Sequence, residues 1–402
     1  MKVLLVGSGA REHALAWRLS QSEGLELHAA PGNPGIATLG HCHPARADDR
    51  DGLLALATTL EVDLVVVGPE GPLVAGVADE LRHAGIAVFG PSAAAAQIEG
   101  SKLFAKEVMA AAGVPTAATM SVARLPCVIK ADGLAGGKGV FVCRTNEELD
   151  SGLRGAAAIG GAVVIEELLE GSEVSLFALC DGTRAVPLGA AQDFKRASDG
   201  DTGPNTGGMG AYSPVALPAS AAELVSQIHQ PVLDELARRG TPFVGCLFAG
   251  LMLTDDGPKV LEFNARFGDP ETQVLVPRLE GDLLEALAAA ARGGAVEDLV
   301  REGGEAAVTV VVAGPDYPAR SDYAGVRIDG IAEAEAGGAL VFQGGTASRD
   351  GALLTNGGRI LSVTALAASL AEARRRAYTA VDEVSFEGMR FRTDIAAVAA
   401  GG

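Results

Sequence analysis

The 402-residue chain lacks a long apolar segment, an excess of basic charge and any clustered cysteines. Its longest apolar runs, such as residues 64–67 and 286–291, fall far short of the roughly 20 residues that span a bilayer, so we expect no membrane segment. The five cysteines stand singly without a C-x-x-C pair, which argues against a disulfide framework or a zinc ribbon and predicts buried, reduced thiols. With 32 Lys and Arg against 51 Asp and Glu, the net charge of −19 argues against general binding to nucleic acid or anionic lipid.

The remaining composition, 48% apolar and 21% charged, is typical of a packed soluble protein. A length of 402 residues predicts two to four compact units, because single cores stop growing beyond roughly 250–300 residues. The N-terminal residues show no apolar stretch followed by a small-residue cleavage site, so we expect a cytoplasmic protein. If such an acidic protein binds phosphates, it must do so locally, through a metal ion, a few Lys and Arg residues, and N–H groups at helix starts.

The first hundred residues alternate strands, glycine-rich turns and helices. We expect strands at residues 2–6, 63–67 and 86–89. We expect helices at residues 11–20 and 73–84. This alternation predicts a Rossmann-like parallel α/β domain over residues 1–101, with ligand loops at the carboxyl ends of the strands.

After residue 101 the pattern changes to apolar runs separated by longer glycine-rich loops. We expect a second domain over residues 102–315, with a hairpin formed by residues 127–130 and 140–143. Its polar stretch at 192–214 is too long for a simple connector and predicts a functional or disordered loop. The last residues, 316–402, predict a small α+β domain.

A glycine motif, Gly7-x-Gly9-x-x-Glu12, follows the first strand. A dinucleotide-binding fingerprint would have glycine in place of Glu12, which argues against a nicotinamide cofactor. The helix start, with Arg11 beside it, could hold one phosphate group. A simple glycine turn is the alternative interpretation.

Lysine is scarce, and its scarcity singles out one loop. Only seven of the 32 basic residues are lysine, and two of them, Lys130 and Lys138, bracket a glycine-rich loop between two strands. The loop lacks the glycine spacing and the Ser or Thr of a P-loop. The two lysines could instead clamp a triphosphate from two sides, because lysine supplies a mobile point charge.

Two other segments give weaker signals. The acidic turn that includes Glu166, Glu167 and Glu173 could offer backbone groups to adenine and carboxylates to ribose, but a solvated acidic turn explains it equally well. The run His41-Cys42-His43 could bind a metal; on one loop with no third ligand in view, a surface role is favoured.

The sharpest constellation surrounds Glu262, Asn264 and Arg266. On a strand, residues i and i+2 share a face, so Glu262 and Asn264 present two hard oxygen ligands in one direction, with Arg266 next if the strand persists. This set suits magnesium held between protein and phosphates, with a guanidinium to neutralise a transferring phosphoryl group. An edge strand with polar outer residues is the alternative interpretation.

Together these segments resemble the ATP-grasp superfamily and, within it, the ligases that join glycine to 5-phosphoribosylamine, over essentially the whole chain. The resemblance rests on seven runs of residues, of which the two longest are the most specific: residues 7–13, 68–70, 99–102, 130–135, 201–214, 262–272 and 355–359.

The resemblance implies an ATP-grasp fold that is preceded by the Rossmann-like domain, followed by the small α+β domain, and equipped with a mobile lid at about residues 120–186. It implies ATP-dependent ligation of glycine to 5-phosphoribosylamine, through glycyl phosphate, to give glycinamide ribonucleotide, ADP and phosphate in purine biosynthesis. ATP would be a co-substrate, with two Mg²⁺ or Mn²⁺ ions in its complex. The partners would be these small molecules, with no nucleic acid or membrane, and the protein would be a monomer.

The resemblance also implies site residues. The metal ligands would be Glu262 and Asn264, and the ATP-binding residues would be Lys102, Lys130, Lys138, Glu166, Glu167, Leu169 and Glu173. We assign catalytic roles to Arg266, Asp193 and Lys138. We expect glycine and ribosylamine phosphate to contact Gly9, Arg11, Glu12, Glu70, Lys195, Pro204, Gly208, Met209 and Gly210.

The chain departs from the usual family pattern at Ala10, Gly136 and Phe194. Phe194 stands where the family usually has histidine, which removes any proton transfer by that side chain and makes its contact with substrate doubtful. Two other hypotheses are an ATP-grasp ligase for another carboxylate, such as bicarbonate or formate, and a nucleotide-binding regulatory protein without catalysis. The loop at 201–214 argues against the former, and the Glu262, Asn264 and Arg266 set against the latter.

Overall fold

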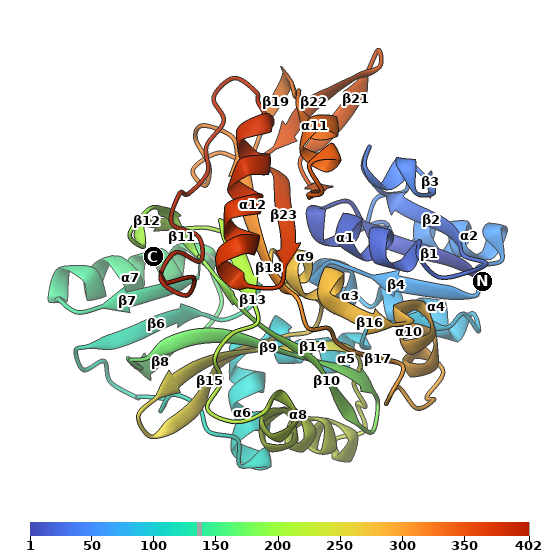
Figure 1. Cartoon of the computed structure of the whole chain (residues 1–402). Coiled ribbons are helices and arrows are strands. Elements are labelled where there is room, and N and C mark those ends of the chain that lie inside the picture. Colours follow the sequence, from blue (N-terminus) through green and yellow to red (C-terminus); the bar gives the residue numbers. More distant parts are fainter. Residues whose placement is uncertain (135–138, 402) are drawn as a thin grey trace.

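The computed structural model describes residues 1–134 and 139–401, in which helices surround several sheets (Figure 1). Lys138 and Gly136, to which the sequence analysis drew attention, lie outside the described residues. Three sheets position the candidate site: one near the N-terminus, one large sheet in the middle and one small sheet at the side (Figure 1).

The N-terminal sheet has five strands in the order β3 (His41–Cys42), β2 (Glu26–Pro31), β1 (Lys2–Gly7), β4 (Leu64–Val67) and β5 (Val88–Phe89). All neighbouring strands run parallel, which confirms the predicted parallel α/β arrangement. Its helices are α1 (Ala10–Leu19), η1 (Ile36–Thr38), α2 (Arg50–Leu60), α3 (Glu70–Val74), α4 (Val77–His83) and α5 (Ala93–Gly100). Strand β4 is buried throughout, as expected for a parallel sheet that is covered on both faces.

Three details of this region differ from the sequence expectations. The single helix expected at 73–84 is two helices, α3 and α4, because Gly76 between them takes a left-handed conformation with φ of +88°. The segment expected as a loop at His41 and Cys42 forms the edge strand β3. Cys42 is exposed there, since an edge strand is open to solvent, whereas the other four cysteines are buried and all five are free.

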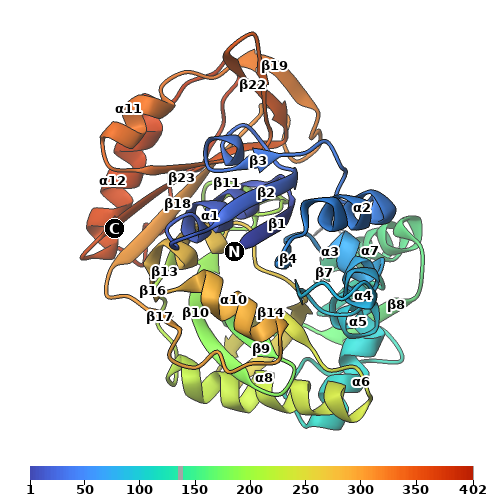
Figure 2. The same cartoon turned by 90° about the vertical axis from the view of Figure 1, so that its right-hand side faces the viewer.

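The large sheet has eight strands in the order β15 (Gly257–Asn264), β14 (Val244–Thr254), β9 (Ser172–Asp181), β10 (Ala185–Asp193), β13 (Gly210–Ser213), β18 (Ala306–Ala313), β23 (Arg359–Ala367) and β20 (Leu340–Gln343). Each pair of neighbours is antiparallel. Helices α6 (Lys102–Ala112) and α8 (Ala221–Arg238) pack together near this sheet, at the lower end of the molecule (Figure 2). The sheet therefore joins strands from the second and third predicted domains.

The small sheet has the order β7 (Val140–Cys143), β6 (Cys127–Ala131) and β8 (Val163–Glu167), with helix α7 (Asn146–Ile159) against it. Strands β6 and β7 pair antiparallel from Cys127 with Cys143 to Lys130 with Val140, which confirms the predicted hairpin. The polar stretch expected as a loop at 192–214 instead holds a ribbon of β11 (Arg196–Ser198) and β12 (Thr202–Asn205), followed by β13.

The remaining elements complete the C-terminal half. They are α9 (Thr272–Leu275), η2 (Val276–Arg278), β16 (Leu279–Gly281), α10 (Leu283–Ala291), β17 (Val300–Glu302), β19 (Tyr323–Arg327), α11 (Ile331–Ala336), β21 (Thr346–Arg349), β22 (Ala352–Gly357) and α12 (Leu370–Glu383). In the described part of the chain, no helix has both the length and the apolarity needed to cross a bilayer.

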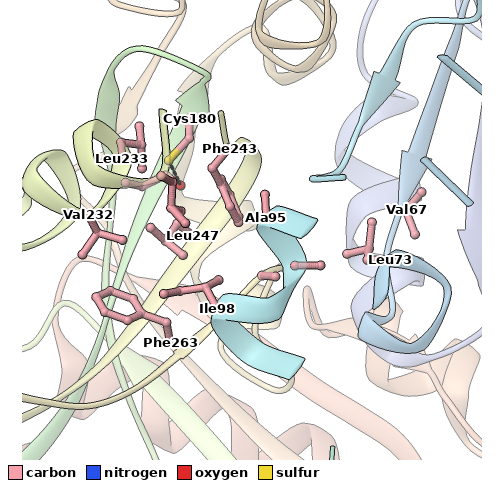
Figure 3. Packing of buried hydrophobic residues seen from close by; sticks show 14 of the residues in the cluster. Val67, Leu73, Ala95, Ile98, Cys180, Val232, Leu233, Phe243, Leu247 and Phe263 are labelled. Carbon is pink, nitrogen blue, oxygen red and sulfur yellow. Dashed lines mark hydrogen bonds between the residues drawn. The ribbon is translucent and has the colours of Figure 1, made fainter. Parts of the chain in front are cut away.

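One hydrophobic cluster connects the N-terminal sheet with the large sheet (Figure 3). Val67 and Leu73 come from the N-terminal region, Ile98 comes from α5, and Leu247 and Phe263 come from β14 and β15. In Figure 3, α5 lies between the two groups. Because this core is shared, the ends of β1, β4 and β15 are held at fixed positions relative to one another.

Candidate functional site

The glycine turn after β1 is shaped around the buried side chain of Glu12. Its Oε2 accepts a hydrogen bond from the N–H of Gly9 at 2.6 Å, so a side chain of the first turn caps the start of α1. A Cβ atom at Gly68 would lie 2.1 Å from Glu12 Oε1, and one at Gly7 would lie 2.6 Å from Glu12 Cγ. Glu12 was expected to contact substrate, but its side chain instead caps the start of α1 and packs against Gly7 and Gly68. This structural role explains why position 12 is glutamate and not the glycine of a dinucleotide-binding motif.

Arg11 is also engaged by the protein. Its Nε donates to Glu12 Oε1 at 2.6 Å, and its Nη1 donates to the carbonyl oxygen of Phe267 at 3.2 Å. Only 7% of Arg11 is exposed. The guanidinium expected to hold a substrate phosphate thus links α1 to the segment that follows β15.

Two lysines meet one buried carboxylate where ATP is expected. Lys106 Nζ lies 2.7 Å from Glu166 Oε1, and Lys130 Nζ lies 2.7 Å from Glu166 Oε2. Lys130 also donates to the carbonyl oxygen of Leu261 at 2.8 Å, which ties β6 to β15. Lys106 was missed by the sequence analysis, although the scarcity of lysine could have identified it.

Further contacts surround this pair. Lys259 Nζ lies 3.7 Å from Glu167 Oε1, and Glu167 also accepts from the N–H of Ala118 at 2.9 Å. Lys102 Nζ donates to the carbonyl oxygen of Gly133 at 3.0 Å. The predicted Leu169 lies in the segment between β8 and β9. Five of the seven lysines, namely those at 102, 106, 130, 195 and 259, thus contact residues of this region or its borders.

Asp132 fixes the end of β6 to the start of α6. Its Oδ1 accepts from the N–H of Lys102 at 2.6 Å and from Ser101 Oγ at 3.2 Å. Asp132 was not among the predicted site residues, although its place in the motif at 130–135 was an available signal.

Glu262 and Asn264 lie two residues apart at the end of β15 and so share one face of the strand, as predicted. Burial would raise the pKa of Glu262, but Lys195, Lys130 and Lys102 outweigh it and lower this pKa. An ionised carboxylate and an amide oxygen are hard ligands that fit Mg²⁺, which takes its remaining ligands from water and phosphates. Within the described residues, no group of three His, Cys, Asp or Glu side chains could hold a metal by itself.

Arg266 lies beside Asn264, to whose Oδ1 its Nη2 donates at 3.3 Å. Two carboxylates of the N-terminal region hold the same guanidinium: Glu70 Oε2 at 3.1 Å from Nε and Glu99 Oε1 at 3.2 Å from Nη2. Glu99 also accepts from the N–H of Ala265 at 2.7 Å. Of these two carboxylates, Glu70 was predicted from the sequence, whereas Glu99, which precedes α6 in the motif at 99–102, was not.

Asp193 and Lys195 approach the predicted ribose ligand Glu173. Lys195 Nζ forms an ion pair with the Glu173 carboxylate. Burial raises the pKa of Asp193, Lys195 opposes this change, and Glu271 and Glu173 add to it. Glu271, which was not predicted as a site residue, accepts a hydrogen bond from Ser175 Oγ at 3.2 Å.

A cavity of about 630 Å³ opens beside these residues. Gly9 is the one predicted substrate residue in its lining, which otherwise consists of Ala10, Asn205, Thr206, Gly207, Asp269, Tyr317, Pro318, Ser321, Gly344, Gly345, Gly358, Arg359, Leu361 and Ser362. Its walls come from the N-terminal turn, the end of β12 and its connection to β13, the segment after β15 that carries Asp269, and the C-terminal region.

Arg359 is the arginine of this lining. Its Nη2 donates to Asp269 Oδ2 at 2.9 Å, and its Nη1 donates to the carbonyl oxygens of Gly207 at 2.6 Å and Asp269 at 3.1 Å. A guanidinium has five N–H donors, so among the described residues two donors remain for a ligand.

Four other predicted substrate residues, Pro204, Gly208, Met209 and Gly210, flank the lining residues 205–207 in sequence but are not in the lining themselves. Met209 and Gly210 are buried at the start of β13, and a Cβ atom at Gly208 would lie 2.4 Å from Cδ of Pro270. Pro204 is exposed in β12. These residues shape the loop that carries Asn205, Thr206 and Gly207.

The shared core, the lysine-rich region around Glu166, and the Glu262, Asn264 and Arg266 set together indicate an ATP-grasp enzyme, and comparisons with known proteins agree. Three family models match: the N domain of phosphoribosylglycinamide synthetase at residues 1–99, its ATP-grasp (A) domain at 100–272, and its C domain at 307–398. The chain belongs to the phosphoribosylglycinamide synthetase family.

Similar proteins support the same assignment. The phosphoribosylamine–glycine ligase of Streptomyces coelicolor is 52% identical over 100% of both chains. The crystal structure of phosphoribosylamine–glycine ligase from Thermotoga maritima has a TM-score of 0.85 at 35% identity and covers 98% of this chain and 100% of that one. The biotin carboxylase domain of Hydrogenobacter thermophilus 2-oxoglutarate carboxylase, in complex with MgADP and bicarbonate, shares the fold with a TM-score of 0.71 at 18% identity, covering 97% of this chain and 91% of that one.

Proposed function

We propose that this protein joins glycine to 5-phosphoribosylamine at the expense of ATP and gives glycinamide ribonucleotide, ADP and phosphate, a step of purine biosynthesis. The observation that carries this proposal is the end of β15, where Glu262 and Asn264 share one face, Lys130 donates to the carbonyl oxygen of Leu261, and Arg266 donates to Asn264. The positive charges of Lys195, Lys130, Lys102 and Arg266 lower the pKa of Glu262, which suits a carboxylate that holds a metal ion beside phosphates. The 52% identity with a full-length phosphoribosylamine–glycine ligase supports the choice of substrates.

In the first step, an oxygen of the glycine carboxylate attacks the γ-phosphorus of ATP, and the bond from this phosphorus to the oxygen of ADP breaks. Glycyl phosphate and ADP result. Lys130 and Lys102 hold the phosphates, and Arg266, fixed by Glu70 and Glu99, faces the transferring group. Glu262 and Asn264 would hold Mg²⁺ or Mn²⁺, two ions in the ATP complex, which would neutralise phosphate charge.

In the second step, the amine of phosphoribosylamine attacks the carbonyl carbon of glycyl phosphate. The carbon–nitrogen bond forms, the carbon–oxygen bond to phosphate breaks, and the amine loses a proton. We assign Asp193 to accept this proton, because burial raises its pKa and makes it a stronger base than an exposed aspartate. Lys195, paired with Glu173, would fix the orientation of this segment.

The cavity would receive the phosphorylated ribose. Arg359 keeps two N–H donors for a ligand among the described residues. The glycines at 344, 345 and 358 also line the cavity, and because they have no side chain their backbone is open to the ligand. Arg11 has its guanidinium on Glu12 and Phe267, so we transfer the proposed phosphate contact from Arg11 to Arg359.

Other parts of the proposal follow the family resemblance. Lys138 would contact the phosphates of ATP, Glu173 the ribose, and the backbone near Glu167 and Leu169 the adenine. Residues 1–101, 102–315 and 316–402 would form three domains, with a lid at about 120–186. The protein would act as a monomer in the cytoplasm, where its free cysteines stay reduced.

The test is ADP release by the purified protein with ATP and magnesium. Glycine is supplied together with phosphoribosylamine made in place from ribose 5-phosphate and ammonia, and each component is omitted in turn. We expect ADP only when both substrates are present. ADP release that ignores glycine but responds to bicarbonate or formate would overturn the assigned substrate.

A further inference from the structure

The tip of the β11–β12 ribbon is held by residues 392–395, which follow α12 and which we call the C-terminal brace. The N–H of Thr393 donates to Asp199 Oδ1 at 2.8 Å, and its Oγ1 donates to Asp199 Oδ2 at 2.5 Å. The N–H of Gly200 donates to Asp394 Oδ2 at 2.8 Å. Figure 1 shows the C-terminus beside β11 and β12.

Arg392 is the centre of the brace and is 1% exposed. Its Nε and Nη2 donate to the two oxygens of Asp394 at 2.7 and 2.6 Å. Its Nη1 donates to Asp201 Oδ1 at 2.8 Å and to the carbonyl oxygen of Arg196 at 3.1 Å. One guanidinium therefore bonds the first residue of β11, the turn between β11 and β12, and its own segment.

The brace is itself fixed on α12. Tyr378 OH donates to the carbonyl oxygen of Arg392 at 2.7 Å and accepts from the N–H of Ile395 at 3.0 Å. Arg374 donates to the carbonyl oxygens of Thr393 at 2.7 Å and Ile395 at 2.9 Å. The ribbon is thus anchored to a packed helix and not to a loose tail.

The connection to the site runs through Phe194. Its ring lies 5.0 Å from the Arg392 guanidinium carbon and packs in the core of the C-terminal region, at 6.2 Å from the Tyr212 ring. Neighbouring side chains of extended backbone point to opposite sides, and Lys195 accordingly reaches Glu173 of β9. The side chain at position 194 therefore faces Arg392 while those on either side of it face the site.

From these contacts we infer that Arg392 is a positioning residue, which holds the Asp193–Lys195 segment and the β12–β13 loop in the geometry that glycine and phosphoribosylamine require. The inference rests on the proposed function. The cation–π contact and the ion pairs fix Phe194 and the ribbon together, so loosening them shifts the side chains at 193 and 195. Lys106, Lys130 and Glu166, which form ion pairs where ATP is proposed to bind, lie on other elements.

The test compares separate KM values for ATP, glycine and phosphoribosylamine in three variants. Arg392→Lys keeps the charge but loses the planar fork that bonds Asp394 twice. Asp201→Asn weakens the same contact from the ribbon, and asparagine tolerates the left-handed backbone at this 70% exposed side chain. Arg375→Ala is the matched control, because this arginine on α12 is 68% exposed and pairs only with Glu372 among the described residues.

We expect Arg392→Lys to raise the KM for glycine or phosphoribosylamine about tenfold or more, with the KM for ATP unchanged within about twofold. The reason is that a displacement of site groups by about 1 Å can lower the reaction rate by up to about 100-fold. Asp201→Asn should act in the same direction and carries the test if Arg392→Lys does not fold. Unchanged KM values in the folded variants, or a mere loss of active protein with normal KM values, would overturn the inference. Absence of glycine-dependent ADP release in the parent protein would instead overturn the proposed function and the inference with it.

Discussion

Replacing Arg359 by methionine should weaken binding of the phosphate of phosphoribosylamine and leave the binding of ATP and glycine unchanged. The side chain lines the cavity, contacts Asp269 and Gly207, and keeps two N–H donors among the described residues. Methionine keeps much of its apolar length but removes the charge and every donor. Asp269 retains the hydrogen bond from Gln273 Nε2 at 2.8 Å, so its carboxylate is not left without a partner.

The expected size of the effect follows from the lost contact. A hydrogen bond to a charged group contributes about 1.5–3 kcal/mol. Since about 1.4 kcal/mol corresponds to a factor of ten, the KM for phosphoribosylamine should rise about 10-fold to 100-fold. The KM values for ATP and glycine should stay near those of the parent protein, because neither is placed against Arg359.

The assay is initial-rate ADP release with one substrate varied at a time. Arg320→Ala is the matched control: it removes a largely exposed arginine that pairs with Asp322 close to the cavity-lining Ser321. An unchanged KM for phosphoribosylamine in a folded Arg359→Met variant would refute the placement. If the KM for phosphoribosylamine instead rose selectively in an Arg11→Lys variant, the substrate phosphate would be assigned to the N-terminal turn.

Three further changes test other parts of the account. Glu262→Gln should lower turnover by about 100-fold or more without lowering the unfolding temperature, and near-normal activity at low magnesium would contradict its role as metal ligand. Gly68→Ala should destabilise by about 1–3 kcal/mol, because the new Cβ meets Glu12 Oε1 at 2.1 Å, whereas Gly71→Ala, with nothing within 4 Å, should be neutral in thermal unfolding. Burial lowers the pKa of His229 from 6.5 to about 4. Between these two pH values the unfolded chain binds a proton at His229 and the folded chain does not, so the free energy of unfolding decreases as the pH falls from 6.5 to about 4. His229→Leu should remove about 3 kcal/mol of that fall between pH 7 and 4 in denaturant titrations, and an unchanged pH dependence would contradict it.

Much of the fold could be predicted because local patterns set it. The alternation of apolar runs and glycine turns before residue 101 predicts the parallel sheet, and the paired runs around Lys130 predict the hairpin of β6 and β7. Gly76 was harder to interpret, since a glycine within a helical pattern is usually tolerated, yet here its left-handed conformation separates α3 from α4. The ribbon within 192–214 was missed because polar, glycine-rich strands carry no alternating apolar signal.

The site shows the same division. Glu262 and Asn264 could be placed together from strand periodicity, because both lie in β15. The strand ends at Asn264, so periodicity does not extend to Arg266, although Arg266 Nη2 still donates to Asn264 Oδ1. Partners distant in sequence could not be deduced. Glu99 accepts a hydrogen bond from the N–H of Ala265, 166 residues away, and Arg359 donates to Asp269, 90 residues away. Arg11 illustrates the converse limit, because a basic residue at a helix start suggests an anion site until its intramolecular acceptors are known.

The central claim is that glycine is activated as glycyl phosphate, and oxygen transfer tests it most directly. Glycine with both carboxylate oxygens labelled with ¹⁸O is turned over with ATP and phosphoribosylamine, and the released phosphate is analysed by mass spectrometry. The account predicts one ¹⁸O atom in each phosphate, because the attacking carboxylate oxygen leaves with the phosphoryl group in the second step. Phosphate without label, formed together with glycinamide ribonucleotide, would contradict the account.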